Sequence, residues 1–325
     1  MVVVDACSAT ASGLVPGEKC RQLIVTQVES LITDPMKICQ EYLRPNNITE
    51  ALQALSDSPG TTSPIAGGTD LILELQQGLH PPVHTLVDIT GIPEMTVLEI
   101  RGEELYIGAA VPLNRIASSS IVNGHARALL EACSLIGGPQ VRNVATLGGN
   151  VAHALPAADG TIALMALDAQ ALVTDTQGFR RIFLAELFLG PGKTSLRNGK
   201  ELLVGFYIPV CQSHQASAFK RIMRAQGIAL PILNVAVWLE RHANHVAQLR
   251  IAVGPSGPTP QRIHPAEDAL IGQPLNPETC SKALNALLDQ VHFRTSPQRA
   301  TADYRRHIVG GLLSSTLETA WQRAA

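Results

Sequence analysis

The chain has 325 residues, of which 46% are hydrophobic and 16% charged, and its formal net charge is −2. A chain of this length can form two or three compact units with their own cores. The near-neutral charge lacks the basic excess that is typical of nucleic-acid-binding proteins. No apolar run reaches the roughly 18 residues that a membrane-spanning helix needs, so we expect no such helix.

The cysteines and the first residues bear on the compartment and on metal binding. No two cysteines have the C-x-x-C spacing, which argues against a zinc site or an iron–sulfur cluster held by local thiolates. Scattered single cysteines are typical of a reducing compartment. The opening MVVVDACSATASG lacks the basic start of a signal peptide, so we expect a cytoplasmic location.

Residues 1–35 differ in pattern from the rest of the chain. Within them, Glu18–Thr33 carries an apolar stripe with helical spacing, and Asp34-Pro35 ends it. We interpret this part as an N-terminal extension of unknown role, with one helix that docks on the protein or on a partner.

From Met36 the pattern predicts a unit of strands, a glycine turn and helices. Asn47 and Glu50 have the spacing of a capping box at a helix start. The expected elements are an extended piece over 42–45, a helix over 50–55, a short buried strand over 63–66, a turn at Gly67-Gly68, a helix over 69–77 with partly buried leucines, and a strand over 84–89.

Two further units follow. In the second we expect a strand over 105–109, a helix over 126–135, a glycine- and turn-rich stretch over 137–159, a helix over 161–167 and a strand over 169–174. In the third, which begins near His214, we expect strands over 234–240 and 247–253, a turn over 254–260, and helices over 266–271, 277–288 and 300–318. The scattered histidines, including His153, form no metal-binding pattern and are interpreted as surface or capping groups.

Two glycine-rich segments are the candidates for ligand binding. We call Ile65–Leu71 (IAGGTDL) the first glycine segment and Ala145–Val151 (ATLGGNV) the second. Paired glycines allow positive φ and a close approach of backbone to ligand, and successive N–H groups form a concave anion site. If the two turns face each other they could clamp a diphosphate; the alternative is two tight turns without a ligand. Neither has the G-x-G-x-x-G pattern of a Rossmann site.

The two segments stand in a specific context. Gly137–Asn143 leads into the second segment, Pro156–Asp159 follows it, and the loop Phe188–Thr194 precedes a strand at Glu201–Val204. Together with Phe219-Lys220 and Thr301–Arg306, these stretches resemble the flavin subunit of the molybdenum hydroxylases over residues 36–320. That family includes carbon monoxide, xanthine and nicotinate dehydrogenases.

The resemblance implies an α+β fold with two main parts. Residues 36–212 would form an FAD-binding domain of the PCMH/vanillyl-alcohol-oxidase type, with subdomains at about 36–92 and 93–212. Residues 213–325 would form a smaller α+β C-terminal domain of the CO dehydrogenase flavoprotein type, with a three-stranded sheet plus helices.

The resemblance also implies a function and partners. The chain would take electrons from the [2Fe-2S] clusters of a small subunit and pass them from FAD to NAD+, a quinone or oxygen. A large subunit would hold the molybdopterin cofactor and the substrate, in a dimer of heterotrimers. No catalytic residue or metal is then expected in this chain.

The same resemblance implies the residues that bind FAD. The segment from Pro64 to Leu71 would wrap the diphosphate from one side, and Thr146 to Asn150 would close from the other. Asp159 would bind the adenosine ribose or simply cap a helix, Leu202 and Leu203 would line the cofactor pocket or pack in the core, and Lys220 would lie near the flavin or in solvent. The full set is Pro64, Ile65, Ala66, Gly67, Gly68, Thr69, Asp70, Leu71, Thr146, Gly148, Gly149, Asn150, Asp159, Leu202, Leu203 and Lys220.

Some features depart from the family pattern. Many relatives carry an acidic residue where Gly227 stands, and some flavin subunits hold an extra four-cysteine cluster for which this chain has no insertion. Two alternatives stay open. One is a stand-alone FAD-dependent oxidoreductase of the same fold, and the other is a flavin-free subunit that acts as an assembly scaffold.

Overall fold

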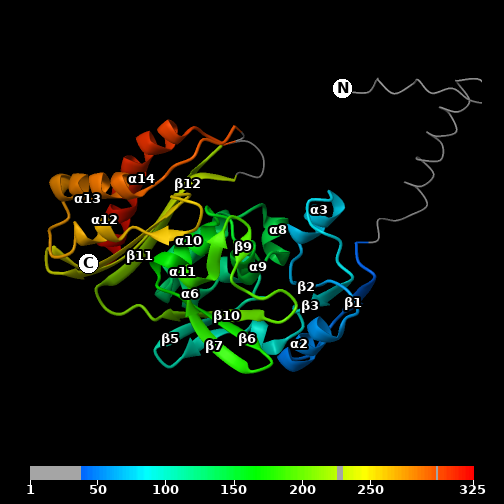
Figure 1. The fold of residues 1–325 in the computed structure, drawn as a ribbon. Helices are drawn as coiled ribbons and strands as arrows, with labels where there is room; N and C mark the ends of the chain where they lie inside the picture. Colours follow the sequence, from blue (N-terminus) through cyan, green and yellow to red (C-terminus); the bar gives the residue numbers. More distant parts are fainter. Residues whose placement is uncertain (1–37, 225–229, 298) are drawn as a thin grey trace, which may run out of the picture. The chain divides into compact units, whose positions relative to one another are not determined.

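The computed structural model describes residues 38–224, 230–297 and 299–325 (Figure 1). The helix expected over Glu18–Thr33 and the position of Gly227 lie outside the described residues. Within the described ranges no helix is both long and apolar enough to cross a bilayer.

The first sheet has three parallel strands and carries the first glycine segment. The strand order is β1-β3-β2, so that β3 lies in the centre. Helix α2 begins after Asn47, whose side chain accepts a hydrogen bond from the Glu50 amide, as the capping pattern predicts. The elements are β1 (Glu41–Leu43), α2 (Ile48–Asp57), β2 (Thr62–Ile65), α3 (Leu71–Gln76) and β3 (Thr85–Asp88).

Burial in this region differs from the sequence expectation. Strand β2 was expected to be buried, but of its residues only Ile65 is buried. Helix α3 begins two residues later than predicted; Leu71 and Leu75 are partly buried as expected, whereas Leu73 is 51% exposed. The cause is position: β2 is an edge strand and α3 follows it, so most side chains there remain at least partly exposed.

The second sheet has five antiparallel strands in the order β4-β5-β10-β6-β7. The second glycine segment lies among the helices between β5 and β6. These elements are α4 (Pro93–Thr96), β4 (Leu98–Arg101), β5 (Glu104–Gly108), α5 (Leu113–Ala117), α6 (Ser120–His125), α7 (Arg127–Leu135), α8 (Pro139–Val144), α9 (Leu147–Ala152), α10 (Asp159–Ala166), β6 (Gln170–Asp175), β7 (Gly178–Phe183), α11 (Leu184–Leu187), the hairpin β8 (Phe188–Gly190) and β9 (Lys193–Thr194), and β10 (Leu202–Pro209).

The third sheet belongs to the C-terminal part of the chain and has antiparallel strands in the order β11-β12-β13-β14. We expected three strands. The additional β14 is a two-residue pairing beside the end of β13, too short to leave a hydrophobic pattern in the sequence. The elements are β11 (Gln215–Met223), β12 (Pro231–His242), β13 (His245–Gly254), β14 (Gln261–Arg262), α12 (His264–Asp268), α13 (Pro277–Gln290) and α14 (Ala302–Arg323).

The third sheet is covered on both faces (Figure 1). Along β12, Ala236 and Trp238 join the core that contains α7 and α10, whereas Val235 and Val237 join a second core with α13 and α14. This alternation follows from the period of two in a β-strand. The C-terminal sheet therefore packs directly on α10, the helix that follows the second glycine segment.

Candidate functional site

The first glycine segment presents unused backbone donors. Ile65 ends β2 with a buried side chain and accepts a hydrogen bond from the Ile89 amide at 3.0 Å. The chain then turns at Gly68, whose φ of +65° strains any residue with a Cβ. Among the described residues, the backbone amides from Ala66 to Leu71 have no hydrogen-bond acceptor. Consecutive free N–H groups of this kind form a concave anion site.

The second glycine segment is a helix start, and our prediction of a glycine turn is wrong here. Thr146 is the N-cap of α9, and its hydroxyl accepts a hydrogen bond from the Gly149 amide at 3.1 Å. The Gly148 amide donates to Ala109 O at 2.8 Å, and the Asn150 amide donates to Thr146 O at 3.0 Å. The backbone amides from Leu147 to Asn150, which we expected to face a ligand, therefore already have acceptors inside the protein.

The two glycines of the second segment have different surroundings. Gly148 is buried, and a Cβ on it would lie 2.5 Å from the Ala109 Cβ and 2.6 Å from the Ala109 carbonyl oxygen. Gly149 is exposed, and a Cβ on it would meet only the Thr146 hydroxyl, at 3.2 Å. Gly148 thus permits the helix to pack on Ala109, while Gly149 keeps the outer surface of α9 open.

The structure brings the two segments together. A Cβ on Gly67 would lie 2.0 Å from Val144 O, immediately before the second segment, so the two backbones are in contact. The His153 ring at the end of α9 also reaches α3, with Nε2 3.0 Å from Glu74 Oε1 and Nδ1 3.6 Å from Asp70 Oδ2. We had interpreted His153 as a surface group, and a lone histidine gives no sequence signal for this bridge.

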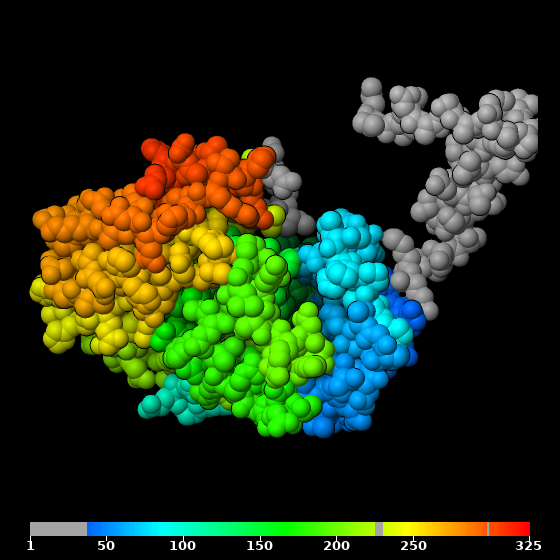
Figure 2. Space-filling model, viewed as in Figure 1, coloured from blue at the N-terminus to red at the C-terminus, as the bar shows by residue number. Residues whose placement is uncertain are grey.

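The surface is hollowed beside the contact of Gly67 with Val144, which we call the glycine junction. In Figure 2 a depression lies between the cyan region around α3 and the green segments, with darker green atoms at its base. The nearest charged side chains of the first segment's helix, Asp70 and Glu74, are acidic. The free backbone amides of the first segment are therefore the donors that an anion at this junction would meet.

Asp159 has a different environment from the one predicted. The N-cap of α10 is Ala158, so the helix-cap role is wrong. The Asp159 side chain is 3% exposed, one of its oxygens contacts Arg221 Nη1, and the other accepts from Asn234 Nδ2 at 2.6 Å. Burial raises the pKa of this carboxyl above its usual value, although Arg221 and Asn234 oppose the rise. The structure thus does not bring Asp159 to the surface of the glycine junction.

The remaining predicted residues lie on β10 and β11. Leu202 and Leu203 are buried in the core of the second sheet. Lys220 is half-buried on β11, and its Nζ donates to the carbonyl oxygen of Ser315 at 2.9 Å and to the Ser315 hydroxyl at 2.6 Å. Its ammonium is therefore held against α14, which neither of our interpretations anticipated.

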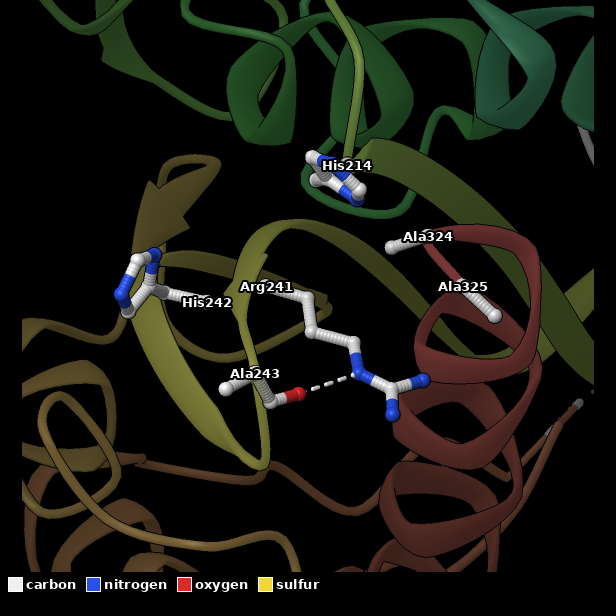
Figure 3. Close-up of a pocket in the computed structure, with 6 residues that line it drawn as sticks. All are labelled: His214, Arg241, His242, Ala243, Ala324 and Ala325. Atoms are coloured by element: carbon white, nitrogen blue, oxygen red, sulfur yellow. Dashed lines mark hydrogen bonds between the residues drawn. The ribbon is translucent and has the colours of Figure 1, made fainter.

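Two shallow cavities lie apart from the glycine segments. One, of about 410 Å³, is lined by His214, Arg241, His242, Ala243, Ala324 and Ala325 (Figure 3). The other, of about 390 Å³, is lined by residues that include Asp175, Arg197 and Lys200. In Figure 3 the Arg241 guanidinium is turned to the Ala243 carbonyl oxygen, with Nε 2.7 Å away. In the described ranges, no three or more histidine, cysteine, aspartate or glutamate side chains form a group that could hold a metal ion.

Comparison with known proteins gives two family matches and many relatives. Residues 36–211 match the FAD binding domain in molybdopterin dehydrogenase, and residues 217–320 match the CO dehydrogenase flavoprotein C-terminal domain. The xanthine dehydrogenase FAD-binding subunit of Escherichia coli O157:H7 is 31% identical over 282 residues, covering 86% of this chain and 95% of the relative. The carbon monoxide dehydrogenase medium chain of Hydrogenophaga pseudoflava is 30% identical over 285 residues, covering 88% and 98%.

Solved structures agree with these matches. A chain of the carbon monoxide dehydrogenase from Hydrogenophaga pseudoflava that lacks the Mo-pyranopterin moiety superposes with a TM-score of 0.83 at 29% identity, covering 88% of this chain and 98% of that one. The relatives named for different substrates are about equally similar, so similarity selects no substrate. The predicted FAD cofactor and α+β fold are confirmed. The chain belongs to the family of FAD-binding subunits of the molybdenum hydroxylases.

Proposed function

We propose that this chain is the electron-transfer subunit that carries FAD between the [2Fe-2S] clusters of a partner and a final electron acceptor. NAD+, a quinone and oxygen are the acceptor classes that fit such a subunit. The observation that supports the proposal most is the row of free amides from Ala66 to Leu71, in contact with the backbone that leads into α9.

The glycine junction fits the diphosphate of FAD. A diphosphate needs several N–H donors and close backbone approach, and the first segment has both. A side chain on Gly68 would be strained and would press on Ile72, which is consistent with a requirement for glycine. When FAD is bound, its isoalloxazine supplies the chemistry of accepting and releasing electrons. The chain itself would hold the cofactor in position and determine how much of it is exposed to solvent.

We assign the site residues as follows. Pro64 to Leu71 would hold the diphosphate, with the amides of Ala66 to Leu71 as donors. Thr146, Gly148, Gly149 and Asn150 would form the opposing wall, which contributes shape and an open surface at Gly149 in place of backbone donors. Leu202 and Leu203 would support the wall from the core, and Lys220 would place its charge through the contact with Ser315. Asp159 would act on the FAD site indirectly, through the start of α10.

We further propose that residues 36–212 form the FAD-binding domain and residues 213–325 the C-terminal domain. The partners would be a large molybdopterin-binding subunit and a small [2Fe-2S] subunit, in a dimer of heterotrimers. The names of the relatives support this arrangement, because they are called medium chains or medium subunits.

Purification of the native assembly tests the proposal. We expect the chain to copurify with a larger and a smaller subunit, with one FAD per copy of this chain and with molybdenum and iron in the partners. Reduction by substrate followed by mixing with NAD+, a quinone or oxygen identifies the acceptor. A chain that purifies alone with FAD and oxidises a substrate by itself supports the stand-alone oxidoreductase, and a chain without FAD in an intact assembly supports the scaffold.

A further inference from the structure

We propose that Arg221 is a positioning residue for the FAD site, and that it acts through its buried ion pair with Asp159. The C-terminal sheet would thereby set the start of α10 and, through it, the wall formed by α9. This inference rests on the proposed function, because it concerns the same FAD site.

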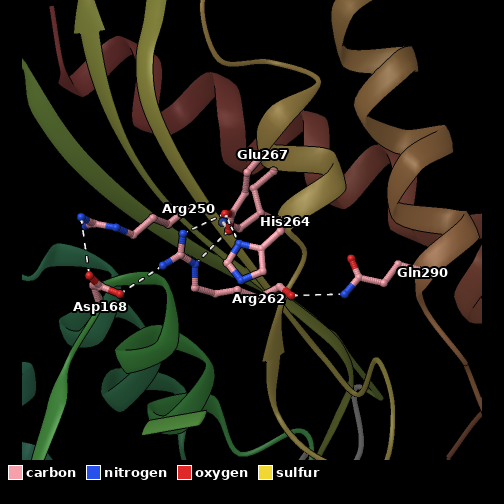
Figure 4. Close-up of polar contacts among 7 residues, drawn as sticks. Asp168, Arg250, Arg262, His264, Glu267 and Gln290 are labelled. Atoms are coloured by element: carbon pink, nitrogen blue, oxygen red, sulfur yellow. Dashed lines mark hydrogen bonds and ion pairs between the residues drawn. The ribbon is translucent and has the colours of Figure 1, made fainter. Parts of the chain in front are cut away.

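Helix α10 is tied to the C-terminal sheet at both ends. At its start, Asp159 contacts Arg221 of β11 and Asn234 of β12, and the side chains of Asp159 and Arg221 are 3% and 5% exposed. Just beyond its end, Asp168 lies 3.1 Å from Arg262 Nη1 and 3.8 Å from Arg250 Nη2 (Figure 4). Asp168 is more accessible, with 35% of its side chain exposed. The helix therefore has a buried ion pair at its start and a more accessible ion pair just beyond its end.

Of the two ends of α10 described above, the start is the one that contacts the second glycine segment. A Cβ on Gly160 would lie 2.7 Å from Asn150 Oδ1 and 3.1 Å from Leu147 Cδ1, so α9 rests on α10 at this glycine. Gly160 directly follows Asp159. The contacts of Asp168, in contrast, run to β13 and β14. A shift of Asp159 would thus move the support of α9, whereas a shift of Asp168 would not.

Packing and not hydrogen bonding positions the side-chain oxygen of Asn150. Its Oδ1 is buried and has no hydrogen-bond partner among the described residues, and the same is true of Asn234 Oδ1 and Arg221 Nε. Because no hydrogen bond restrains Asn150 Oδ1, the position of this side chain depends on its contact with α10. Asn150 is also a residue of the wall that we assign to FAD, which connects the ion pair to the cofactor.

Arg221 is itself firmly fixed. Its Nη2 donates to the carbonyl oxygen of Leu135 at the end of α7, while Nη1 reaches Asp159. The guanidinium thus joins α7 and α10 to β11. Removal of one member of a buried pair leaves an uncompensated charge, and the surrounding helices must shift or admit water.

Asp159→Asn and Arg221→Met test the inference, and Asp168→Asn serves as the matched control at the other end of α10. FAD affinity is measured on the folded full-length chain, with folding verified by circular dichroism. We expect Asp159→Asn and Arg221→Met each to raise the FAD dissociation constant by about tenfold or more, the scale of coupling within one contact network. The double variant should bind FAD no more weakly than either single variant. Asp168→Asn should change FAD affinity less than about twofold, as expected for sites that share no partner.

A second readout does not require FAD. Amide hydrogen exchange of Gly148 and Gly149 in the cofactor-free chain should accelerate in the Asp159 and Arg221 variants and stay unchanged in Asp168→Asn. Where Asp159→Asn fails to fold, Arg221→Lys keeps the charge and should give an intermediate effect on both readouts. Equal effects of the variants at the two ends of α10 would overturn the inference. Failure of the unmodified chain to bind FAD would overturn the proposed function instead.

Discussion

The two glycine segments look alike in sequence and are built for different tasks. Ala66-Gly67-Gly68-Thr69 leaves its amides without acceptors among the described residues, whereas the amides of Leu147-Gly148-Gly149-Asn150 donate to Thr146 and to the chain beside β5. In the first segment glycine permits positive φ and contact with Val144 O. In the second, Gly148 permits a helix to pack on Ala109. Paired glycines therefore mark places where two backbones come close together. The hydrogen bonds of their amides show whether these amides are free for a ligand or already have acceptors in the protein.

The largest expected effect is that of Gly67→Ala. The added Cβ would lie 2.0 Å from Val144 O, a backbone atom, and would force the two segments apart. We expect a loss of about 1–3 kcal/mol of stability, as for other overpacked sites, together with loss of FAD binding. Chemical denaturation and flavin absorbance measure the two effects. Gly124→Ala, with no atom within 4 Å of the new Cβ, is the control and should retain FAD.

Gly148 and Gly149 separate stability from binding. Gly148→Ala should lower the free energy of unfolding by about 1–3 kcal/mol, because the new Cβ presses on Ala109. Gly149→Val places its side chain on the exposed surface of α9, so we expect loss of FAD binding with the fold retained. Thermal unfolding and FAD titration of both variants test this. Stoichiometric FAD in Gly149→Val would refute the wall that we assign to α9.

Thr146→Ala should have a smaller effect. It removes the N-cap hydroxyl that accepts from the Gly149 amide, and loss of such a cap costs about 1 kcal/mol. Thr146→Ser keeps the hydroxyl and should be close to the unmodified chain in denaturant titrations. If Thr146→Ala leaves stability unchanged, the hydrogen bond from Gly149 does not hold the start of α9.

The smallest expected effect is a pH dependence at Asp88, which pairs with Ile65 at the end of the first sheet. Burial alone would raise the pKa of Asp88, but hydrogen bonds from Thr90 and Tyr42, together with Arg44, hold it below its usual value. A carboxyl with a lowered folded-state pKa stabilises the protein above its unfolded pKa of about 4 and loses this contribution as the pH falls further. Asp88→Asn should therefore be less stable than the unmodified chain at pH 7, and the difference should shrink below about pH 4. Urea titrations of both proteins at several pH values measure this difference in stability. A difference that stays constant as the pH falls would contradict this role of Asp88.

Much of the fold followed from the sequence because long elements carry periodic patterns. The helix predicted over 277–288 is α13 (Pro277–Gln290), and the strand predicted over 105–109 is β5 (Glu104–Gly108). The two glycine segments were also recognisable, since their residue types are unusual and their context resembles a known family. Their contact through Gly67 and Val144 confirms only that they meet, and the roles of the individual residues stay predictions.

The rest depended on long-range contacts that no local pattern records. Whether Gly148 donates to a ligand or to Ala109 is decided by where β5 ends, which the sequence of the segment does not encode. Arg221 gave no signal, because a lone arginine on a strand is indistinguishable from a surface residue until its partner Asp159 is located. Strand β14 is too short to produce a pattern.

Hydrogen exchange of the chain with and without FAD tests whether the first glycine segment holds the diphosphate. We expect fast exchange of the amides from Ala66 to Leu71 in the free chain and strong protection once FAD is bound. The amides of Gly148 and Gly149 should already be protected in the free chain, since their acceptors lie within the protein. Protection that appears on FAD binding only at Gly148 and Gly149, with none gained from Ala66 to Leu71, would show that the first glycine segment does not hold the diphosphate.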